Sequence, residues 1–282
     1  MAIFDTRPDG WEPGRPAALL VHGLGGCAHA PYISRLAAKL AARGVRCVRL
    51  NLRGAGPGFG IARNFYHAGR SGDVRRAAEW LTERSPGSPL ALIGFSLGGN
   101  LVLKLAGEAS AEPLIGLDCV LAAGVPIDLE ACCERIRSGR NRVYDWNFLR
   151  SLRAEVVRIE AEFPGGPASD LASVGSLYEF DDRYTAPRDG FSGALHYYNE
   201  SSAAAYLPRI EVAGLVVQAR DDPFIPVTCF EKARFPAGLS LELTPHGGHL
   251  GFLDRRGEGR DRHWLDRRLI AWLANRWQGR LV

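Results

Sequence analysis

The sequence of 282 residues lacks any apolar run long enough to span a membrane. Its most apolar stretch, residues 114–125, contains Asp118, whereas a membrane-spanning helix needs roughly 18 or more residues with few charges. The first ten residues also lack the basic segment followed by an apolar segment that is typical of an export signal. We therefore expect a cytoplasmic protein with no transmembrane segment.

Cysteine and lysine are both scarce. The six cysteines do not form the spaced pairs of a disulfide framework, since Cys132 and Cys133 are neighbours and a chain of this length can bury its own core. Lysine supplies three of the 35 basic residues, and the arginines that supply the rest are interspersed with 31 acidic residues, which leaves a net charge of +4. We expect reduced thiols and no nucleic-acid partner.

Signals for metal and nucleotide binding are weak or missing. His246 and His249 have a spacing that two metal ligands could have, but no cysteine or glutamate is suitably spaced to complete a site. The glycine-rich segment 53–60 is interrupted by Pro57 and is not followed by the G-K-[ST] of a phosphate-binding loop. The sequence therefore predicts neither a metal nor a cofactor.

Strand-like and helical patterns alternate along most of the chain. This alternation predicts a single α/β domain over residues 1–282, with a mostly parallel central sheet and helices on both faces. Asp73 is expected to be the N-cap of the second helix. Strands are expected at 17–21, 45–50, 89–93, 117–124, 214–219 and 239–243, with helices between them, after Ser96 and over 265–273.

Ser96 lies between two glycines, directly after one of these strands and before an apolar helix. In the pattern G-x-S-x-G, Gly94 and Gly98 leave room for a sharp turn that exposes the serine hydroxyl. The helix N-terminus adds amide N–H groups and a dipole that favour developing negative charge. We predict that Ser96 is a nucleophile. The N–H of Leu97 and that of Leu24, in the glycine-rich loop after an upstream strand, are expected to form an oxyanion hole.

A serine nucleophile needs a histidine base and a carboxylate that orients the histidine. His249 follows two glycines and is predicted to be the base, with His246 as a loop or supporting residue. The carboxylate is Asp221 or Asp222, at the end of the strand 214–219. Only one of the two can face the histidine, because adjacent residues point in different directions.

The segment 126–208 has no clear strand pattern and is expected to form a helical cap or lid. Insertions of this kind in α/β enzymes lie over the carboxyl ends of the strands, where ligands bind. Trp146, Phe148 and Leu149 are expected to contribute an apolar wall of a substrate pocket, the alternative being a helix that only packs on the body. The basic stretch 135–143 is interpreted as a solvated face, with peripheral contact with a membrane surface as the alternative.

Five short segments together resemble the YheT-like branch of the α/β-hydrolases, and the likeness covers roughly residues 15–275. The resemblance implies an α/β-hydrolase fold and a Ser–Asp–His esterase or lipase-type enzyme; animal relatives are known as lipid hydrolases. It also implies Asp222 as the acid, because many such hydrolases carry the acid three residues after a small residue that closes the strand, here Ala219. The segments are 65–69, 94–100, 180–187, 219–224 and 247–252.

These observations predict a serine hydrolase that cleaves short or medium acyl esters, or acylglycerol-type lipids, through an acyl-enzyme. Ser96, Asp222 and His249 are the expected triad, and a small-molecule or lipid ester is the expected substrate. The same triad serves thioesterases and acyltransferases, which differ in leaving group or acceptor, so these activities are alternatives. A non-catalytic hydrolase-like binding scaffold is a further alternative.

Overall fold

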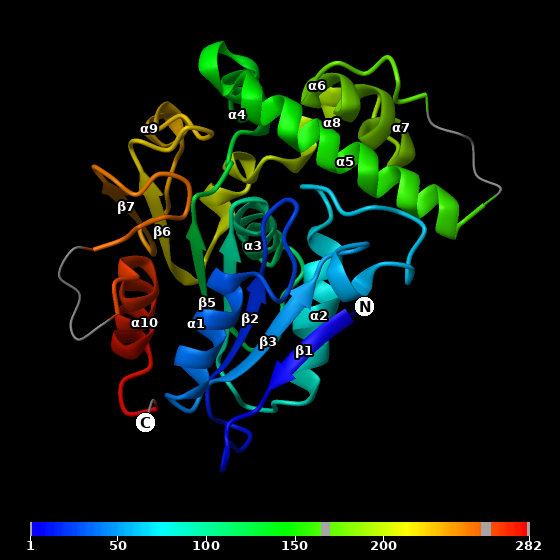
Figure 1. Cartoon of the computed structure of the whole chain (residues 1–282). Coiled ribbons are helices and arrows are strands. Elements are labelled where there is room, and N and C mark those ends of the chain that lie inside the picture. Colours follow the sequence, from blue (N-terminus) through cyan, green and yellow to red (C-terminus); the bar gives the residue numbers. More distant parts are fainter. Residues whose placement is uncertain (1, 165–169, 255–260, 281–282) are drawn as a thin grey trace.

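The computed structural model of the chain describes residues 2–164, 170–254 and 261–280 (Figure 1). Its centre is a seven-stranded sheet in the order β1-β3-β2-β4-β5-β6-β7. β1 runs antiparallel to β3, and the other neighbours are parallel, as the alternation of elements predicted. The strands are β1 (Ala2–Thr6), β2 (Ala17–Val21), β3 (Arg46–Asn51), β4 (Leu90–Phe95), β5 (Leu117–Ala123), β6 (Ala213–Ala219) and β7 (Leu239–Thr244).

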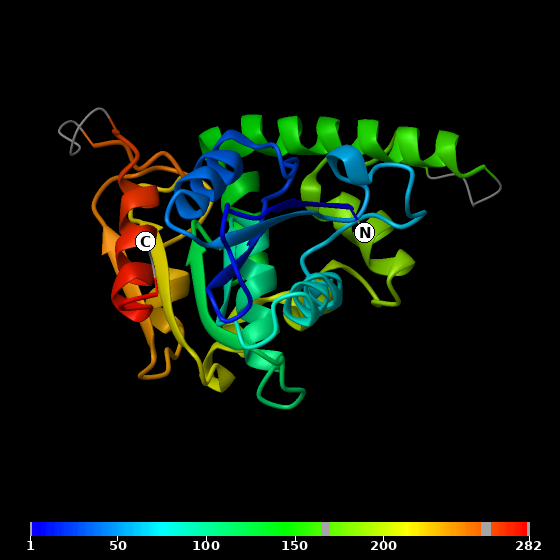
Figure 2. The same ribbon diagram turned by 90° about the horizontal axis from the view of Figure 1, so that it is seen from below.

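Helices cover both faces of the sheet (Figure 2). Ala18 and Leu20 of β2 pack with α1 and α10 on one face, whereas Leu19 and Val21 pack with α2 and α3 on the other. Because successive strand residues point to opposite faces, a strand covered on both sides has a continuous apolar sequence. The helices outside the segment between β5 and β6 are α1 (Pro31–Ala41), η1 (Gly56–Gly58), α2 (Ser71–Glu83), α3 (Leu97–Glu108), α9 (Thr228–Lys232) and α10 (Trp264–Arg276).

The segment between β5 and β6 is helical, and we call its residues 126–208 the cap. Figure 1 shows its helices beyond the edge of the sheet toward which the parallel strands run. The cap has a hydrophobic cluster of its own, which includes Leu149, Val156 and Phe180. Its described helices are α4 (Leu129–Arg137), η2 (Gly139–Asn141), α5 (Arg142–Glu162), α6 (Leu177–Phe180), the π-helical turn η3 (Asp181–Thr185), α7 (Ala186–Arg188), α8 (Ala194–Ser201), η4 (Ala203–Ala205) and η5 (Leu207–Arg209), which ends one residue beyond the cap.

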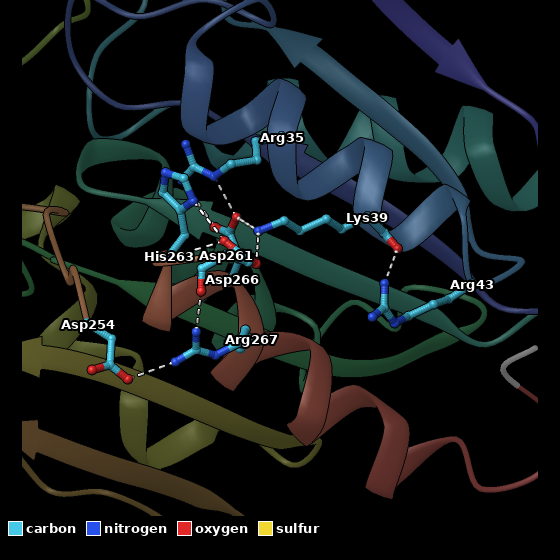
Figure 3. A network of polar contacts seen from close by, with 8 residues as sticks. All are labelled: Arg35, Lys39, Arg43, Asp254, Asp261, His263, Asp266 and Arg267. Atoms are coloured by element: carbon cyan, nitrogen blue, oxygen red, sulfur yellow. Dashed lines mark hydrogen bonds and ion pairs between the residues drawn. The ribbon is translucent and has the colours of Figure 1, made fainter. Parts of the chain in front are cut away.

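A network of ion pairs joins α1 to α10 and to the chain just before α10 (Figure 3). Asp266, of which 2% of the side chain is exposed, accepts hydrogen bonds from Arg35 Nε at 2.6 Å and from Lys39 Nζ at 2.7 Å. Lys39 also contacts Asp261 Oδ2 at 2.7 Å. Because a buried carboxylate needs charged partners, this network fixes α10 against α1.

Two local features differ from the expectations. The second helix begins at Ser71, so Asp73 lies in its first turn instead of capping it, and its carboxylate pairs with Arg53. The edge strand β1 was not predicted, because its residues are only half buried and carry no continuous apolar pattern. None of the helices in residues 2–164, 170–254 and 261–280 combines the length and apolar character that crossing a membrane would need.

Candidate active site

The turn between β4 and α3 holds Ser96 at φ 51° and ψ −123°, a conformation that few residues other than glycine adopt. A Cβ atom on Gly94 would lie 2.2 Å from the carbonyl oxygen of Gly98, and a Cβ atom on Gly98 would lie 2.4 Å from the carbonyl oxygen of Val21. The two glycines therefore let the strand and the helix approach closely. The strained turn presents Ser96 to a large cavity under the cap.

The structure brings Ser96, His249 and Asp222 together at the carboxyl edge of the sheet. His249 Nε2 lies 3.1 Å from Ser96 Oγ, and His249 Nδ1 lies 2.9 Å from Asp222 Oδ2. The Asp222 side chain is fully buried, and 19% of the His249 side chain is exposed. When Nδ1–H donates to the carboxylate, Nε2 keeps a lone pair that can accept the serine proton.

Asp222 is held by three further donors. Gln218 Nε2 donates to Oδ2 at 3.1 Å, and the backbone N–H groups of Phe224 and Ile225 donate to Oδ1 at 2.9 and 3.3 Å. Gln218 is itself fully buried and accepts from the N–H of Val125. Sequence reasoning did not single out Gln218, although a polar residue in the otherwise apolar β6 is a signal that could have identified it.

Asp221 faces the loop before His249 and does not contact its ring. Its Oδ1 accepts from the N–H of Gly248 at 2.7 Å, and its Oδ2 lies 3.3 Å from His246 Nδ1. The Gly248 N–H, together with His246, holds the pKa of Asp221 below its usual range. The two adjacent carboxylates thus point to different histidines, as adjacent positions on a turning chain require.

The loop after β2 passes directly against Ser96. A Cβ atom on Gly23 would lie 2.9 Å from Ser96 Cβ, so only glycine allows this approach. The loop is held by two tyrosines, because the N–H of Gly23 donates to Tyr32 Oη and that of Gly25 donates to Tyr66 Oη. Leu24 and Leu97 both line the cavity beside Ser96. In the described part of the chain, neither of their backbone N–H groups donates to a protein acceptor outside regular helices and strands.

His22 has no exposed surface and orients the same loop through both ring nitrogens. Its Nδ1 lies 2.8 Å from the carbonyl oxygen of Gly23, and its Nε2 accepts from the N–H of Leu52 at 3.1 Å. Burial lowers the pKa of His22 to about 4. A neutral ring with the proton on Nδ1 satisfies both contacts, so His22 can hold the loop by two hydrogen bonds.

A cavity of about 520 Å³ lies between the cap and the edge of the sheet that carries Ser96. Most of its wall is apolar or aromatic, and Ser96 and His249 lie on that wall. A cavity of this size accommodates an organic molecule with a medium-length chain. Its apolar and aromatic lining includes Leu24, Phe65, Leu97, Ile136, Phe148, Leu152, Phe180, Tyr197, Phe224 and Leu250.

The predicted wall of Trp146, Phe148 and Leu149 is only partly present. Phe148 lines the cavity, and its ring packs edge-on against that of Phe224, which in turn packs against His249. Trp146 is 60% exposed and stacks with Arg150, while Leu149 is buried in the core of the cap. Phe148 and Trp146 point to nearly opposite sides of α5, because they are rotated by about 200° from each other about the helix axis, and Leu149 is rotated by about 100° from Phe148.

Asn100, which sequence reasoning did not single out as functional, joins the helix that follows Ser96 to the end of the cap. Its Nδ2 donates to the carbonyl oxygens of Ala68 and Ser201, and its Oδ1 accepts from the N–H of Ala203. The side chain has no exposed surface. A polar residue inside an otherwise apolar helix is the sequence signal for such a buried bridge.

The cysteines and histidines provide no alternative centre within the described residues. All six cysteines are free, and five of them are buried. In the parts of the chain that the structure describes, no group of three or more histidine, cysteine, aspartate or glutamate side chains is arranged to hold a metal.

The chain is similar in sequence to known esterases and lipases. The putative esterase YheT of Escherichia coli K12 is 34% identical over 268 residues, which cover 92% of this chain and 77% of that protein. The monoacylglycerol lipase of Saccharomyces cerevisiae and the phospholipase ABHD3 of mouse are each 27% identical and match 93% and 85% of this chain. The chain spans about 60% of the length of these two eukaryotic relatives.

Solved structures agree with the fold. The esterase Est1E from Butyrivibrio proteoclasticus, with bound ferulic acid, aligns with a TM-score of 0.59 at 12% identity and covers 98% of this chain and 94% of its own. The 2,6-dihydroxy-pseudo-oxynicotine hydrolase aligns with a TM-score of 0.63 at 18% identity, over 97% of this chain and 63% of its own. The model of a protein family described as "alpha/beta hydrolase fold" matches residues 16–256 of the sequence. The chain therefore belongs to the α/β-hydrolase family.

Proposed function

We propose that this protein is a serine hydrolase that cleaves carboxylic esters through an acyl-enzyme. The observation that carries the proposal is the position of His249, whose two ring nitrogens lie within hydrogen-bond distance of Ser96 Oγ and of Asp222. The names of the relatives, which include an esterase, a phospholipase and a monoacylglycerol lipase, support the same class of reaction.

In the first step, His249 Nε2 removes the proton of Ser96 as Oγ attacks the carbonyl carbon of the ester. The imidazolium that forms is stabilised by the buried carboxylate of Asp222. His249 then donates the proton to the alkoxide oxygen of the leaving alcohol, and the C–O bond to that alcohol breaks. In the second step, His249 removes a proton from water as the water oxygen attacks the acyl carbon. His249 then returns this proton to Ser96 Oγ as the bond between the acyl carbon and Oγ breaks, and the carboxylic acid leaves.

The negative charge on the carbonyl oxygen needs donors that are already in place. The N–H of Leu97 is at the first position of α3, where a helix leaves its amide groups without internal partners. We assign this N–H and that of Leu24 to the oxyanion hole. Gly23 supports the assignment, because its lack of a side chain brings the loop that carries Leu24 against Ser96.

The substrate class follows from the cavity. Its apolar walls favour an acyl chain or an apolar alcohol group, and its volume of about 520 Å³ suits short and medium chains. Residues of the cap, among them Phe148 and Leu152 of α5, form part of this wall. We therefore propose that residues 126–208 act as a cap that shapes the substrate pocket.

The experiment measures turnover of p-nitrophenyl esters of increasing chain length together with labelling by a fluorophosphonate probe. The wild-type protein should show both, and Ser96→Ala and His249→Gln should each lower turnover by about four orders of magnitude or more. Ser96→Ala should also abolish labelling. His246→Gln is the matched control, since His246 is exposed and lies outside the cavity, and it should retain activity.

The two readouts separate the possible failures. Labelling without turnover of any ester would contradict ester hydrolysis and favour transfer of the acyl group to an acceptor other than water. An unlabelled wild-type protein would contradict a serine nucleophile altogether.

A further inference from the structure

The wall of the active-site cavity contains one carboxylate that the proposed reaction does not use. Asp181 belongs to η3, where the N–H of Ala186 bonds to the carbonyl oxygen of Asp181, five residues back, in a π-helical turn. Such turns occur often at functional sites. Asp181 is enclosed by the protein yet keeps some accessible surface, and it lines the cavity together with Thr185 and Tyr198. We infer that this surface faces the cavity.

The hydrogen bonds of Asp181 leave part of its capacity unused. Thr185 Oγ1 donates to Oδ1 at 2.8 Å, and Tyr198 Oη donates to Oδ2 at 2.8 Å. An ionised carboxylate has about four acceptor positions, so about two are unused. Within residues 2–164, 170–254 and 261–280, the ion pairs that join carboxylates to basic side chains do not include Asp181. Burial raises its pKa to about 6, and only the two hydroxyl groups oppose this effect.

The surroundings of Asp181 are otherwise aromatic. Phe180 precedes it in the sequence, and Tyr197 and Tyr198 of α8 line the same cavity. Tyr197 Oη accepts from the N–H of Ala68. A ligand that reaches this part of the wall therefore meets an apolar surface with a single strong acceptor. An enclosed acceptor of this kind costs free energy unless a donor satisfies it.

We propose that Asp181 is a specificity-determining residue that binds a hydroxyl group on an otherwise apolar arm of the ester substrate. The proposal rests on the proposed function, because it concerns the same cavity. The hydroxyl can belong to the acyl chain or to the alcohol, and both sources present the same chemistry to Asp181. Thr185 and Tyr198 position the carboxylate by occupying one acceptor position on each oxygen.

A hydroxyl group fits this carboxyl better than an ammonium group does. A hydroxyl both donates and accepts, so it can bond to the ionised and to the protonated carboxyl, and both forms are present near pH 6. An ammonium group only donates, and it would lose its hydration shell in a cavity that offers it one carboxylate and otherwise apolar walls.

The test compares matched pairs of esters that differ only in the hydroxyl groups. For the acyl arm, the pair is p-nitrophenyl hexanoate and p-nitrophenyl 6-hydroxyhexanoate. For the alcohol arm, it is propyl hexanoate and 1-monohexanoylglycerol. The measured quantity is the ratio of kcat/KM for the hydroxylated ester to that for its partner. In at least one arm, the wild-type ratio should be about 10 or more, which is the effect of one hydrogen bond to a carboxyl.

Asp181→Leu removes the acceptor and should bring that ratio to about 1 or below. Asp181→Asn preserves the shape and should lower the ratio at least severalfold. Asp181→Asn therefore still tests the proposal if Asp181→Leu does not fold. Asp182→Asn is the matched control, because Asp182 belongs to the same turn and bonds to the N–H of Ala194, but lies outside the cavity wall. It should keep the wild-type ratio, even if it lowers both rates.

Each other outcome overturns the proposal. Wild-type ratios near 1 in both arms, or a ratio that the Asp181 variants leave unchanged, would show that esters are cleaved without this subsite. A preference for p-nitrophenyl 6-aminohexanoate over the 6-hydroxy ester would overturn the choice of ligand. No turnover of any ester would instead overturn the proposed function, and the subsite with it.

Discussion

Asp266 is buried where α1 contacts α10, and Asp181 lies in the wall of the cavity under the cap. The two aspartates have different partners. Asp266 pairs with Arg35 and Lys39, so its charge is compensated inside the protein (Figure 3). Asp181 accepts from two neutral hydroxyl groups and borders the cavity. A compensated charge fixes two elements of the fold, whereas an uncompensated one beside a cavity can be satisfied by a ligand.

The difference extends to the regions around the two residues. Among the described residues, the hydrophobic cluster on the face covered by α1 and α10 includes none from the cap, and of these two helices only α1 contributes to the cavity wall, through Tyr32. Substitutions at the Asp266 network should therefore lower stability and spare the chemistry. Substitutions at the edge of the sheet beneath the cap should lower the activity and have little effect on stability.

The largest effect is expected at the carboxylate that faces His249. Asp222→Asn should lower kcat/KM for p-nitrophenyl esters by about 10⁴, because the amide no longer favours the histidine tautomer that accepts the serine proton. Asp221→Asn should change it by no more than severalfold, since Asp221 contacts only His246 and the Gly248 N–H. Kinetics of the two variants side by side check the prediction, and a larger loss for Asp221→Asn would contradict the assignment.

The next effect is on stability and concerns the α1–α10 network. Asp266→Asn should lower the free energy of unfolding by about 3 kcal/mol, because Arg35 and Lys39 lose their shared carboxylate. Chemical denaturation gives this value, and kcat should stay near that of the wild type. The control is Glu242→Gln, which breaks the more exposed pair between Glu242 of β7 and Arg268 of α10 and should cost about 1 kcal/mol or less. Equal losses in the two variants would count against the special role of Asp266.

A smaller effect on kcat/KM should distinguish the face of α5 that lines the cavity from the face that is exposed. Phe148→Ala should lower kcat/KM for medium-chain esters by about tenfold, since it removes part of the cavity wall and a ring that packs against Phe224. Trp146→Ala should leave kcat/KM almost unchanged, because Trp146 is largely exposed. Chain-length profiles of both variants provide the measurement. The comparison fails if Trp146→Ala alters the preferred chain length and Phe148→Ala does not.

The smallest effect is a pH dependence of stability that arises from Glu155, another carboxyl group of the cap. Its Oε2 is buried and has no hydrogen-bond partner among the described residues. Burial raises its pKa to about 7, against 4.5 for the unperturbed group. The unfolded chain therefore loses this proton first, so the wild type loses stability as the pH rises from about 4.5 to about 7. Glu155→Gln lacks this loss, and its Tm should exceed the wild-type Tm by more at pH 7.5 than at pH 5. A constant difference would disprove the prediction.

Local sequence was sufficient for the fold and for the serine turn. Continuous apolar runs predicted the buried parallel strands, because each of these strands is covered on both faces. The spacing of Gly94, Ser96 and Gly98 predicted the sharp turn, because the requirement for glycine arises between atoms that are close in the sequence. The edge strand β1 escaped prediction because half-buried residues leave no such run.

The rest of the site depends on contacts that sequence spacing does not encode. Asp221 and Asp222 are equivalent by local pattern, and only the family resemblance favoured Asp222 before their directions were known. The wall of the cavity depends on the rotation of α5, which places Phe148 inward and Trp146 outward. Gln218 and Asp181 were not singled out, because each also depends on a partner on another part of the chain, Val125 for Gln218 and Tyr198 for Asp181.

The hydrogen bonds of Asn100 limit which part of the cap can move when a large substrate binds. It ties the return end of the cap to the helix behind Ser96, through three hydrogen bonds that no solvent reaches. Moving α8 outward would break bonds next to the nucleophile and disturb its alignment. A substrate too large for the cavity is therefore expected to enter by movement of cap elements other than α8.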